Sequence, residues 1–276
     1  MASRSALRPL LAGAMLAALA VAGCRPAGND TASAGNAAAA DQTNLSAASE
    51  LDIVRAMLDM AGVTREDLVV DLGSGDGRIP IMAARDRGAR GLGVEIDPDR
   101  IRRANTNAAS AGVADRVQFR QQDLFVTPLN DVTVLTLYLL PEINLQLRPR
   151  ILAQMRPGTR VVSNSWDMGD WRPDRRQTVD NTNIFLWIVP ARVEGRWQFQ
   201  TEGGGGGELV LDQRYQDISG TISIAGRSIA LSEGRLSGDQ ISFTADLGQG
   251  QRRYVGLVAG NAITGEGWRA TRTGAG

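Results

Sequence analysis

The sequence contains no histidine, and its only cysteine is Cys24. The lack of histidine excludes Ser-His-Asp and Cys-His catalysis, and the two shortages together exclude the histidine-rich and cysteine-rich sites that hold transition metals. Any chemistry must therefore use carboxylates, hydroxyls, amides or a cofactor, and we expect no metal site.

The chain also lacks a net charge, because 30 basic residues balance 30 acidic residues. This balance gives no reason to expect a polyanionic partner such as nucleic acid. The 276 residues are enough for one ordinary α/β domain and one small domain, once an N-terminal leader and linker are set aside.

Residues 1–23 have the features of a signal peptide. Arg4 and Arg8 precede an apolar run over residues 10–22, which is too short to cross a bilayer comfortably but has the length of a signal-peptide core. The alternative is a buried apolar helix near the N-terminus.

The leader ends in VAGC, residues 21–24, which resembles the bacterial lipobox. The resemblance implies that Cys24 is lipidated and becomes the first mature residue, so that the protein is anchored to a membrane of the cell envelope. Arg25 in the next position implies the outer membrane, facing the periplasm, in a Gram-negative cell. Residues 24–45 are mostly small and polar, which is typical of a flexible linker.

Residues 46–190 alternate between strand-like and helix-like segments. A first helix is expected around residues 51–61, and the proline at 149 is expected to divide a later segment into a turn and a helix over Arg150 to Met155. The expected strands are Leu68 to Leu72, Gly91 to Ile96, Val117 to Arg120, Val132 to Tyr138, Arg160 to Asn164 and Asn183 to Val189. This order predicts an α/β domain with a Rossmann-like, doubly wound, mostly parallel sheet.

A glycine-rich turn follows the first of these strands. Gly73, Gly75 and Gly77 allow the backbone to pass close to a ligand. A dinucleotide fingerprint needs its third glycine one position later, where this chain has Arg78, so pyrophosphate binding is disfavoured. The alternative is that the glycines only make a tight turn.

Four acidic residues accompany the strand ends. Asp71 and Asp76 flank the glycines, where they would repel a phosphate but suit a cationic or hydroxyl-rich ligand. Glu95 ends the second strand, where an acidic side chain can accept both hydroxyls of a ribose. Asp123 follows the third strand and could accept from an adenine amino group.

The segments DLGSGDGRI, GVEID and QQDLF, in this order, resemble class I S-adenosylmethionine-dependent methyltransferases of the seven-strand type. Together with TLYLLPE and PGTRVVSNSWDMGDW, they most resemble the small lysine methyltransferase-like group related to the ATP synthase c-subunit enzyme. The resemblance implies S-adenosylmethionine as cofactor and protein lysine as a methyl acceptor. It places Asp71, Gly73 and Gly75 at the methionine part, Glu95 at the ribose, and Asp123 with Leu124 at the adenine.

Methyl transfer needs no histidine base, since the cofactor carries an activated methyl group and the protein must hold the reacting atoms in line and exclude water. Tyr138, after the fourth strand, is the candidate for the transfer site, although an aromatic residue at this position can equally belong to the core. The sequence here departs from the Asn/Asp-Pro-Pro-aromatic motif of many amine methyltransferases.

The segment from Ser163 to Trp171 combines aromatic residues with two aspartates, and it is a candidate for the acceptor mouth or for a solvated loop whose tryptophans pack on the sheet. A Thr-Pro stretch that relatives of this group often carry before the first helix is absent, which leaves the substrate open.

Residues 191–276 contain short alternating runs separated by glycine-rich turns, which predict a small all-β antiparallel barrel or sandwich. The expected strands are Arg196 to Gln200, Glu208 to Leu211, Ile218 to Ile224, Ile241 to Ala245, Tyr254 to Val258 and Ile263 to Trp268. No catalytic constellation is visible in this part, so we expect a binding or structural role.

Two functions are consistent with these observations. The first is an active N-methyltransferase, acting on a protein amine such as lysine. The second is a catalytically inactive, lipid-anchored binding protein of the cell envelope that retains the methyltransferase fold. An export signal on a chain with a site for a cytoplasmic cofactor favours the second, and the intact cofactor residues favour the first.

Overall fold

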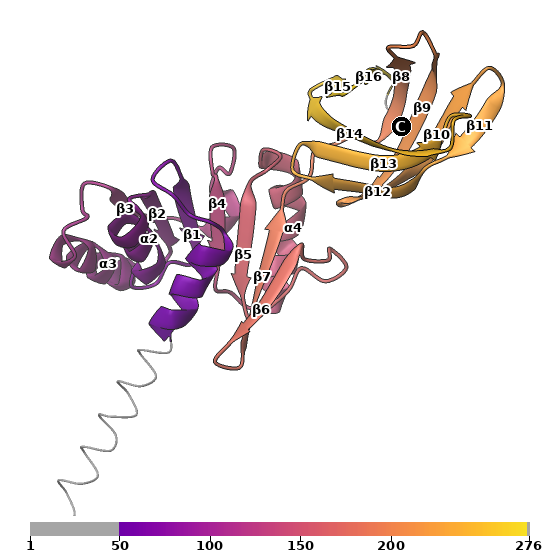
Figure 1. The fold of residues 1–276 in the computed structure, drawn as a ribbon. Helices are drawn as coiled ribbons and strands as arrows, with labels where there is room; N and C mark the ends of the chain where they lie inside the picture. Colours follow the sequence, from indigo (N-terminus) through magenta and orange to yellow (C-terminus); the bar gives the residue numbers. More distant parts are fainter. Residues whose placement is uncertain (1–49, 275–276) are drawn as a thin grey trace, which may run out of the picture. The chain divides into compact units, whose positions relative to one another are not determined.

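The structure is a computed structural model that describes residues 50–274 (Figure 1). The expected signal peptide, Cys24 and the expected linker lie outside these residues. Within the described part of the chain, no helix is long and apolar enough to cross a membrane.

Strands and helices alternate through the first part of this range, as the sequence predicted. A first helix occupies residues 50–60. It is followed by β1 (Leu68–Leu72), α2 (Arg78–Arg87), β2 (Arg90–Glu95), α3 (Pro98–Ser110), β3 (Val117–Gln121), the short 3-10 helix η1 (Leu124–Val126), β4 (Val134–Leu137), α4 (Pro141–Gln154), β5 (Arg160–Asn164), β6 (Arg175–Val179) and β7 (Thr182–Ile188).

The seven strands form one sheet in the order β3-β2-β1-β4-β5-β7-β6. Strands β1 to β5 are parallel to one another, whereas β7 runs antiparallel to both β5 and β6. The strand order reverses between β1 and β4, which is where open α/β sheets bind ligands beyond the carboxyl ends of their strands. The predicted doubly wound, mostly parallel sheet is confirmed.

Helices cover both faces of this sheet (Figure 1). Neighbouring residues of one strand point to opposite faces, so each strand contributes to two cores. On one face, Val69 of β1 packs with Met57 of the first helix. On the other, Val70 packs with Leu147 of α4. The two cores fix the sheet between its helices and thereby fix the positions of the turns at its carboxyl edge.

Strand β6 was not predicted. Its sequence RRQTV is mostly exposed, and it pairs only with β7, so it has the polar character of an edge strand rather than an apolar pattern. A tight hairpin turn joins the two strands, and its two residues, Asp180 and Asn181, have positive φ angles of 46° and 62°. Asp and Asn tolerate this left-handed conformation better than most residues.

The prediction that Pro149 divides its segment was wrong, because α4 runs continuously from Pro141 to Gln154. Pro149 has no backbone N–H, so the helix lacks the hydrogen bond to the carbonyl of Leu145. Leu145 lies on the exposed side of the helix. Leu147 and Ile151 are fully buried on either side of the proline. Their packing on the sheet outweighs the loss of one hydrogen bond at the solvent side.

The rest of the described chain is a closed antiparallel barrel. Its strands are β8 (Gly195–Thr201), β9 (Gly206–Arg214), β10 (Asp217–Ile224), β11 (Arg227–Ala230), β12 (Ser232–Ser237), β13 (Gln240–Asp246), β14 (Gln251–Ala259), β15 (Ala262–Gly265) and β16 (Trp268–Gly274). Pairing between β9 and β10 closes a ring of eight strands, and β11 adds to β10 outside the ring. A barrel, rather than a sandwich, is therefore the correct alternative.

Most of the aromatic residues of the barrel belong to its buried core. Phe199, Phe243, Tyr254 and Trp268 make mutual ring contacts with centroids 5.3–6.0 Å apart.

The single strand expected over Ile263 to Trp268 was wrong, because a two-residue turn after Gly265 divides it into β15 and β16. Strands β11 and β12 were not predicted, because they are short, polar and largely exposed.

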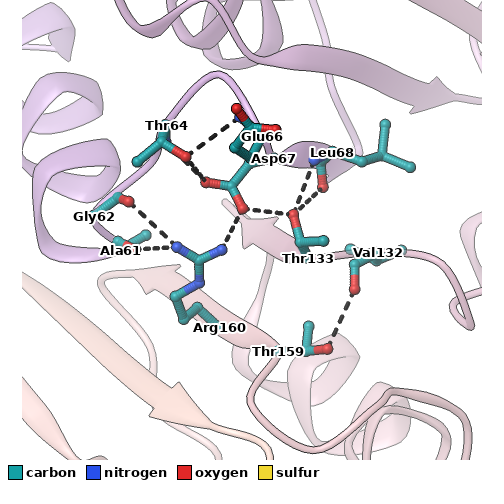
Figure 2. Close-up of polar contacts among 10 residues, drawn as sticks. All are labelled: Ala61, Gly62, Thr64, Glu66, Asp67, Leu68, Val132, Thr133, Thr159 and Arg160. Atoms are coloured by element: carbon teal, nitrogen blue, oxygen red, sulfur yellow. Dashed lines mark hydrogen bonds and ion pairs between the residues drawn. The ribbon is translucent and has the colours of Figure 1, made fainter.

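A polar cluster lies at the amino ends of the parallel strands, on the side of the sheet opposite the glycine turn. It is centred on Asp67, immediately before β1 (Figure 2). One oxygen of the Asp67 carboxylate accepts from the backbone N–H of Thr64 at 2.8 Å, and the other accepts from the Thr133 hydroxyl at 2.8 Å and pairs with Arg160. Burial raises the pKa of Asp67, but these hydrogen bonds and the charge of Arg160 outweigh it and leave the pKa lowered.

Arg160 extends the cluster to the first helix. Its guanidinium also donates to the backbone carbonyls of Ala61 and Gly62, at 2.9 and 3.3 Å, just beyond the end of that helix. The cluster therefore joins the first helix, β1, β4 and β5 at one point, using a carboxylate that is almost completely buried.

We expect Arg160→Ala to lower the free energy of unfolding by roughly 2–3 kcal/mol, because it leaves the buried Asp67 carboxylate without its cation. Urea unfolding followed by circular dichroism measures the change. Arg65→Ala is the control, since Arg65 pairs with Glu66 while both side chains remain about four-fifths exposed, 84% and 79%, and it should have little effect. Equal losses in the two variants would show that the cluster is not a stabilising centre.

Candidate functional site

The turn between β1 and α2 contains the three predicted glycines, all in the left-handed region. Their φ angles are 78° at Gly73, 54° at Gly75 and 81° at Gly77. A Cβ atom at Gly77 would lie 2.4 Å from Phe119, and one at Gly73 would lie 2.7 Å from Leu139, so both positions are constrained by neighbouring side chains. A Cβ at Gly75 would meet nothing within 4 Å. Of the three, Gly75 is therefore the glycine whose backbone faces open space.

Glu95 holds this turn against the end of β2. Its Oε2 accepts from the backbone N–H of Gly75 at 3.1 Å, while its Oε1 accepts from those of Ile96 and Asp97 at 2.8 and 3.1 Å. The side chain is only 7% exposed, and Arg100 lies 3.8 Å from Oε2. Glu95 therefore fixes the shape of the glycine turn as well as presenting an acidic group beside it.

Asp71 is buried in β1, directly before the glycines. The Thr136 hydroxyl of β4 donates to its Oδ1 at 2.8 Å. Burial raises the pKa of the Asp71 carboxyl to about 7, with the charges of Asp76 and Glu95 adding to the rise and the Thr136 hydrogen bond opposing it. A carboxyl that titrates near neutral pH in a cleft marks a candidate functional residue.

Asp76 has a different environment. Arg78 binds both of its carboxylate oxygens through Nε and Nη2, at 2.8–3.3 Å, and also pairs with Glu50 of the first helix. Burial raises the pKa of Asp76, but the hydrogen bonds and charge of Arg78 outweigh it, so the pKa is lowered. Asp76 thus remains ionised and its charge is largely compensated, whereas Asp71 makes no ion pair within the described residues.

Asp71, Gly73, Gly75 and Asp76 line one cleft of about 400 Å³ at the carboxyl edge of the sheet, whereas Glu95 supports the glycine turn without being among the lining residues. Its lining consists of Glu50, Asp71, Gly73, Ser74, Gly75, Asp76, Arg78, Ile79, Arg100, Arg103 and Tyr138. Tyr138 follows β4 and is half exposed, so the alternative that it belongs to the core is wrong. The cleft is thus built from the first helix, β1, the glycine turn, α2, α3 and the end of β4.

Asp123 and Leu124 are not among the residues that line this cleft. Asp123 is exposed and caps η1, where its Oδ1 accepts from the backbone N–H of Phe125 at 2.8 Å. Leu124 packs partly against the core beneath α4. Both residues nevertheless follow β3, which pairs with β2. The backbone N–H of Gln122 donates to the carbonyl of Glu95, the last residue of β2.

The segment from Ser163 to Trp171 is only partly open to solvent. Trp166 is 47% exposed, whereas Trp171 is fully buried. Asp170 accepts from Arg148, Arg214 and the Tyr215 hydroxyl, so its charge is compensated within the protein. The protein's own cations therefore compete with a substrate cation for Asp170, and the part of the segment around Trp166 and Asp167 is the part exposed to solvent without such partners in the described chain.

Several lining residues, including Glu50, Arg100 and Arg103, were not predicted from the sequence. Their side chains come from helices, where charged residues are normally solvated and give no distinct signal. Thr136 had a recognisable signal, since it is a polar residue inside the fully buried strand VLTL. Arg78 was considered only as the position where a glycine is missing, yet it compensates Asp76 and joins the turn to the first helix.

Known proteins resemble the part of the chain that contains this cleft. Residues 71–175 match the family model of the ANTKMT methyltransferase domain. The chain is 37% identical over 142 residues to a protein-lysine N-methyltransferase of Saccharolobus islandicus, covering 50% of this chain and 88% of that protein. It is 34% identical over 142 residues to the adenine nucleotide translocase lysine N-methyltransferase of Mus musculus, covering 51% of this chain and 56% of that protein.

One solved structure of a methyltransferase also resembles this part of the chain. The RNA methyltransferase of Salinibacter ruber, in complex with S-adenosyl-L-homocysteine, is 51% identical, with a TM-score of 0.51, and the match covers 51% of this chain and 93% of that one. The family model ends at residue 175 and so includes no residue of the barrel.

The residues of the cleft fit S-adenosylmethionine. Gly75 leaves open space beside its backbone, and the buried carboxyl of Asp71 makes no ion pair within the described residues, which suits a ligand with a sulfonium and an ammonium group. The cofactor is S-adenosylmethionine, and the chain belongs to the class I S-adenosylmethionine-dependent methyltransferases, in the family of the ANTKMT methyltransferase domain.

Proposed function

We propose that this methyltransferase acts on the ε-amine of lysine in a protein. The observation that carries the proposal is the 37% identity to a protein-lysine N-methyltransferase over 88% of that protein's length. The mouse relative is also named as a lysine N-methyltransferase. The alternative of an inactive binding protein is not favoured, since the matched proteins are named as methyltransferases and the cleft residues fit the cofactor.

The proposal assigns the cofactor contacts to residues at the ends of β1, β2 and β3. Asp71, Gly73 and Gly75 would hold the methionine part, with Asp76 at the edge of the turn. Glu95 would meet the ribose, and Asp123 with Leu124 would meet the adenine. S-adenosylmethionine supplies a methyl group already activated on sulfur, so the protein has only to bind, orient and exclude water.

Tyr138 is the proposed acceptor-side residue, because it lies after β4 and lines the same cleft as Asp71 and Gly73. A lysine amine must lose its proton before it can act as a nucleophile, and a desolvated position favours the neutral form. The Tyr138 hydroxyl can orient this neutral amine by a hydrogen bond, and its ring can exclude water from one side. No histidine is required for these roles.

We expect the full-length protein to transfer tritiated methyl groups from S-adenosylmethionine to lysine in poly-L-lysine or in bacterial envelope proteins. Tyr138→Ala should lower kcat/KM by roughly tenfold or more through lost orientation, with the cofactor Kd within about twofold of wild type. Tyr138→Phe, which keeps the ring, should retain more activity. Amino-acid analysis of the labelled acceptor measures methyl-lysine, and calorimetry measures cofactor binding.

The chain itself contains no lysine, so methyl-lysine in this assay comes from the added acceptor. RNA is tested in parallel because one similar structure is named as an RNA methyltransferase. Label in RNA and none in methyl-lysine would contradict the lysine proposal while leaving the cofactor assignment intact.

The affinity for S-adenosylmethionine should rise with pH through about 7, because burial keeps the Asp71 carboxyl neutral below that value and a cationic ligand favours its ionised form. Below pH 7, binding then releases a proton. As the pH is raised towards 7, the dissociation constant should fall by up to about tenfold per pH unit, and above pH 7 it should level off. Calorimetry from pH 5.5 to 8 in two buffers with different ionisation enthalpies measures both effects. Asp71→Asn is the control and should lose this pH dependence; an unchanged profile in the variant would rule out Asp71 as its source.

We also propose that the protein is a lipoprotein of the cell envelope, on the outer membrane facing the periplasm. Support comes from the charged start, the apolar run and the VAGC sequence of residues 21–24, which lie outside the described residues.

Cys24→Ser should abolish incorporation of labelled palmitate in a bacterial host and move the protein from the detergent phase to the aqueous phase of a Triton X-114 partition. Since Cys24 is the only cysteine of the chain, lipid attached to a cysteine can have no other site. A wild-type protein that takes up no label and stays in the aqueous phase would end the lipoprotein proposal.

A further inference from the structure

Residues 165–174 form the loop between β5 and β6 at the carboxyl edge of the sheet. The strand register places Leu137 of β4 beside Ser163 of β5, so this loop begins next to the segment that carries Tyr138. Its first half is open, with Trp166 half exposed and the Trp166 carbonyl accepting from Asn144 at 3.3 Å. In its second half Trp171 is fully buried, and Asp170, Trp171 and Arg172 contact residues that come from the barrel.

Barrel residues contact the loop from three places: the turn between β9 and β10, Arg214 of β9 on Asp170, and Arg235 of β12 on Asp174. Arg214 pairs with Asp217 in the ladder, so Tyr215 and Gln216 form a two-residue hairpin turn. Tyr215 has a φ of 56°, a conformation that glycine and asparagine adopt readily and a bulky residue does not. A strained residue of this kind indicates that its side chain has a role elsewhere.

The side chain of Tyr215 contacts the loop in two ways. Its ring stacks on Trp171, with centroids 6.0 Å apart and an interplanar angle of 23°. Its hydroxyl donates to Oδ1 of Asp170 at 3.0 Å, where Arg148 of α4 also binds. These contacts explain why a tyrosine occupies a turn position that favours glycine.

Gln216 directs its whole amide at the same loop. It is 2% exposed, its Oε1 accepts from the Trp171 indole N–H at 2.9 Å, and its Nε2 donates to the Arg172 carbonyl at 2.7 Å. Because a buried amide without partners is costly, this pair of bonds fixes the position of the loop relative to the turn.

We infer that Tyr215 and Gln216 are positioning residues for the methyl acceptor, acting through the β5–β6 loop, so that the barrel sets acceptor affinity. The inference rests on the proposed function, which places the acceptor beside Tyr138 at the start of this loop. Neither residue lines the cofactor cleft, so the effect on the acceptor is separable from cofactor binding.

Ala225, in the turn between β10 and β11, offers a matched control. It is also a non-glycine residue with a positive φ, 48°, but it is exposed on a turn that makes none of the contacts to the β5–β6 loop described above. Replacing either residue by glycine relieves the same backbone conformation, and only Tyr215→Gly removes side-chain contacts to the loop.

The test uses the full-length protein, with poly-L-lysine as the acceptor probe. Tyr215→Gly and Gln216→Ala should each raise the KM for poly-L-lysine by about fivefold or more and leave the Kd for S-adenosylmethionine within about twofold. Tyr215→Phe, which keeps the stacked ring, should restore most of the acceptor affinity, and Ala225→Gly should behave as wild type. Hydrogen exchange of residues 165–174, measured by mass spectrometry, should increase in Tyr215→Gly and stay unchanged in Ala225→Gly.

The inference is overturned if Tyr215→Gly matches Ala225→Gly in both acceptor KM and loop exchange, or if its loss lies in cofactor affinity. A wild-type protein that binds cofactor but methylates no lysine contradicts the proposed function instead. In that case the exchange experiment still decides whether the turn holds the loop, because it needs no acceptor.

Discussion

The carboxylate of Glu95 is the interaction on which the shape of the cofactor cleft depends. Beyond the carboxyl ends of β1 and β2, the backbone N–H groups of Gly75, Ile96 and Asp97 no longer pair with a neighbouring strand. Glu95 accepts hydrogen bonds from all three. One carboxylate, only 7% exposed, therefore links the glycine turn to the turn after β2 through charge-assisted hydrogen bonds. The cleft is therefore formed by the protein's own contacts.

The carboxylates of Asp71 and Asp76, which line the cleft, have different partners and therefore different pKa values. Asp76 is bound by Arg78, which lowers its pKa, whereas Asp71 lies five residues earlier with a hydroxyl as its hydrogen-bond partner and a raised pKa. Arg78 therefore compensates Asp76, whereas Asp71 makes no ion pair within the described residues, although Arg100 and Arg103 also line the cleft. An unpaired carboxyl at this place suits a cationic cofactor, and the third glycine of a dinucleotide motif is missing.

The sequence predicted the parallel strands and the glycine turn because apolar strands covered on both faces and glycines with positive φ have strong local signatures. It could not predict contacts between distant residues, such as Arg78 with Glu50, since charged residues on helices look alike in a sequence. It also could not distinguish Trp166 from Trp171, which belong to one short segment, because their burial is decided by α4 and by the turn at Tyr215. The error at Pro149 has a similar origin, since Leu147 and Ile151 hold the helix together by tertiary packing.

The cofactor cleft and the β5–β6 loop are held in place by different parts of the chain. The cofactor cleft is built from residues between Glu50 and Tyr138, and almost all of these lie within the matched family model. The β5–β6 loop lies at the end of that model and is held by Tyr215 and Gln216, which are outside it. A substitution in the barrel turn can therefore move the loop while Glu95, Asp71 and the glycine turn keep their contacts. The cofactor side of the site therefore depends on residues that the family resemblance covers, whereas the contacts that hold the β5–β6 loop depend on residues that it does not cover.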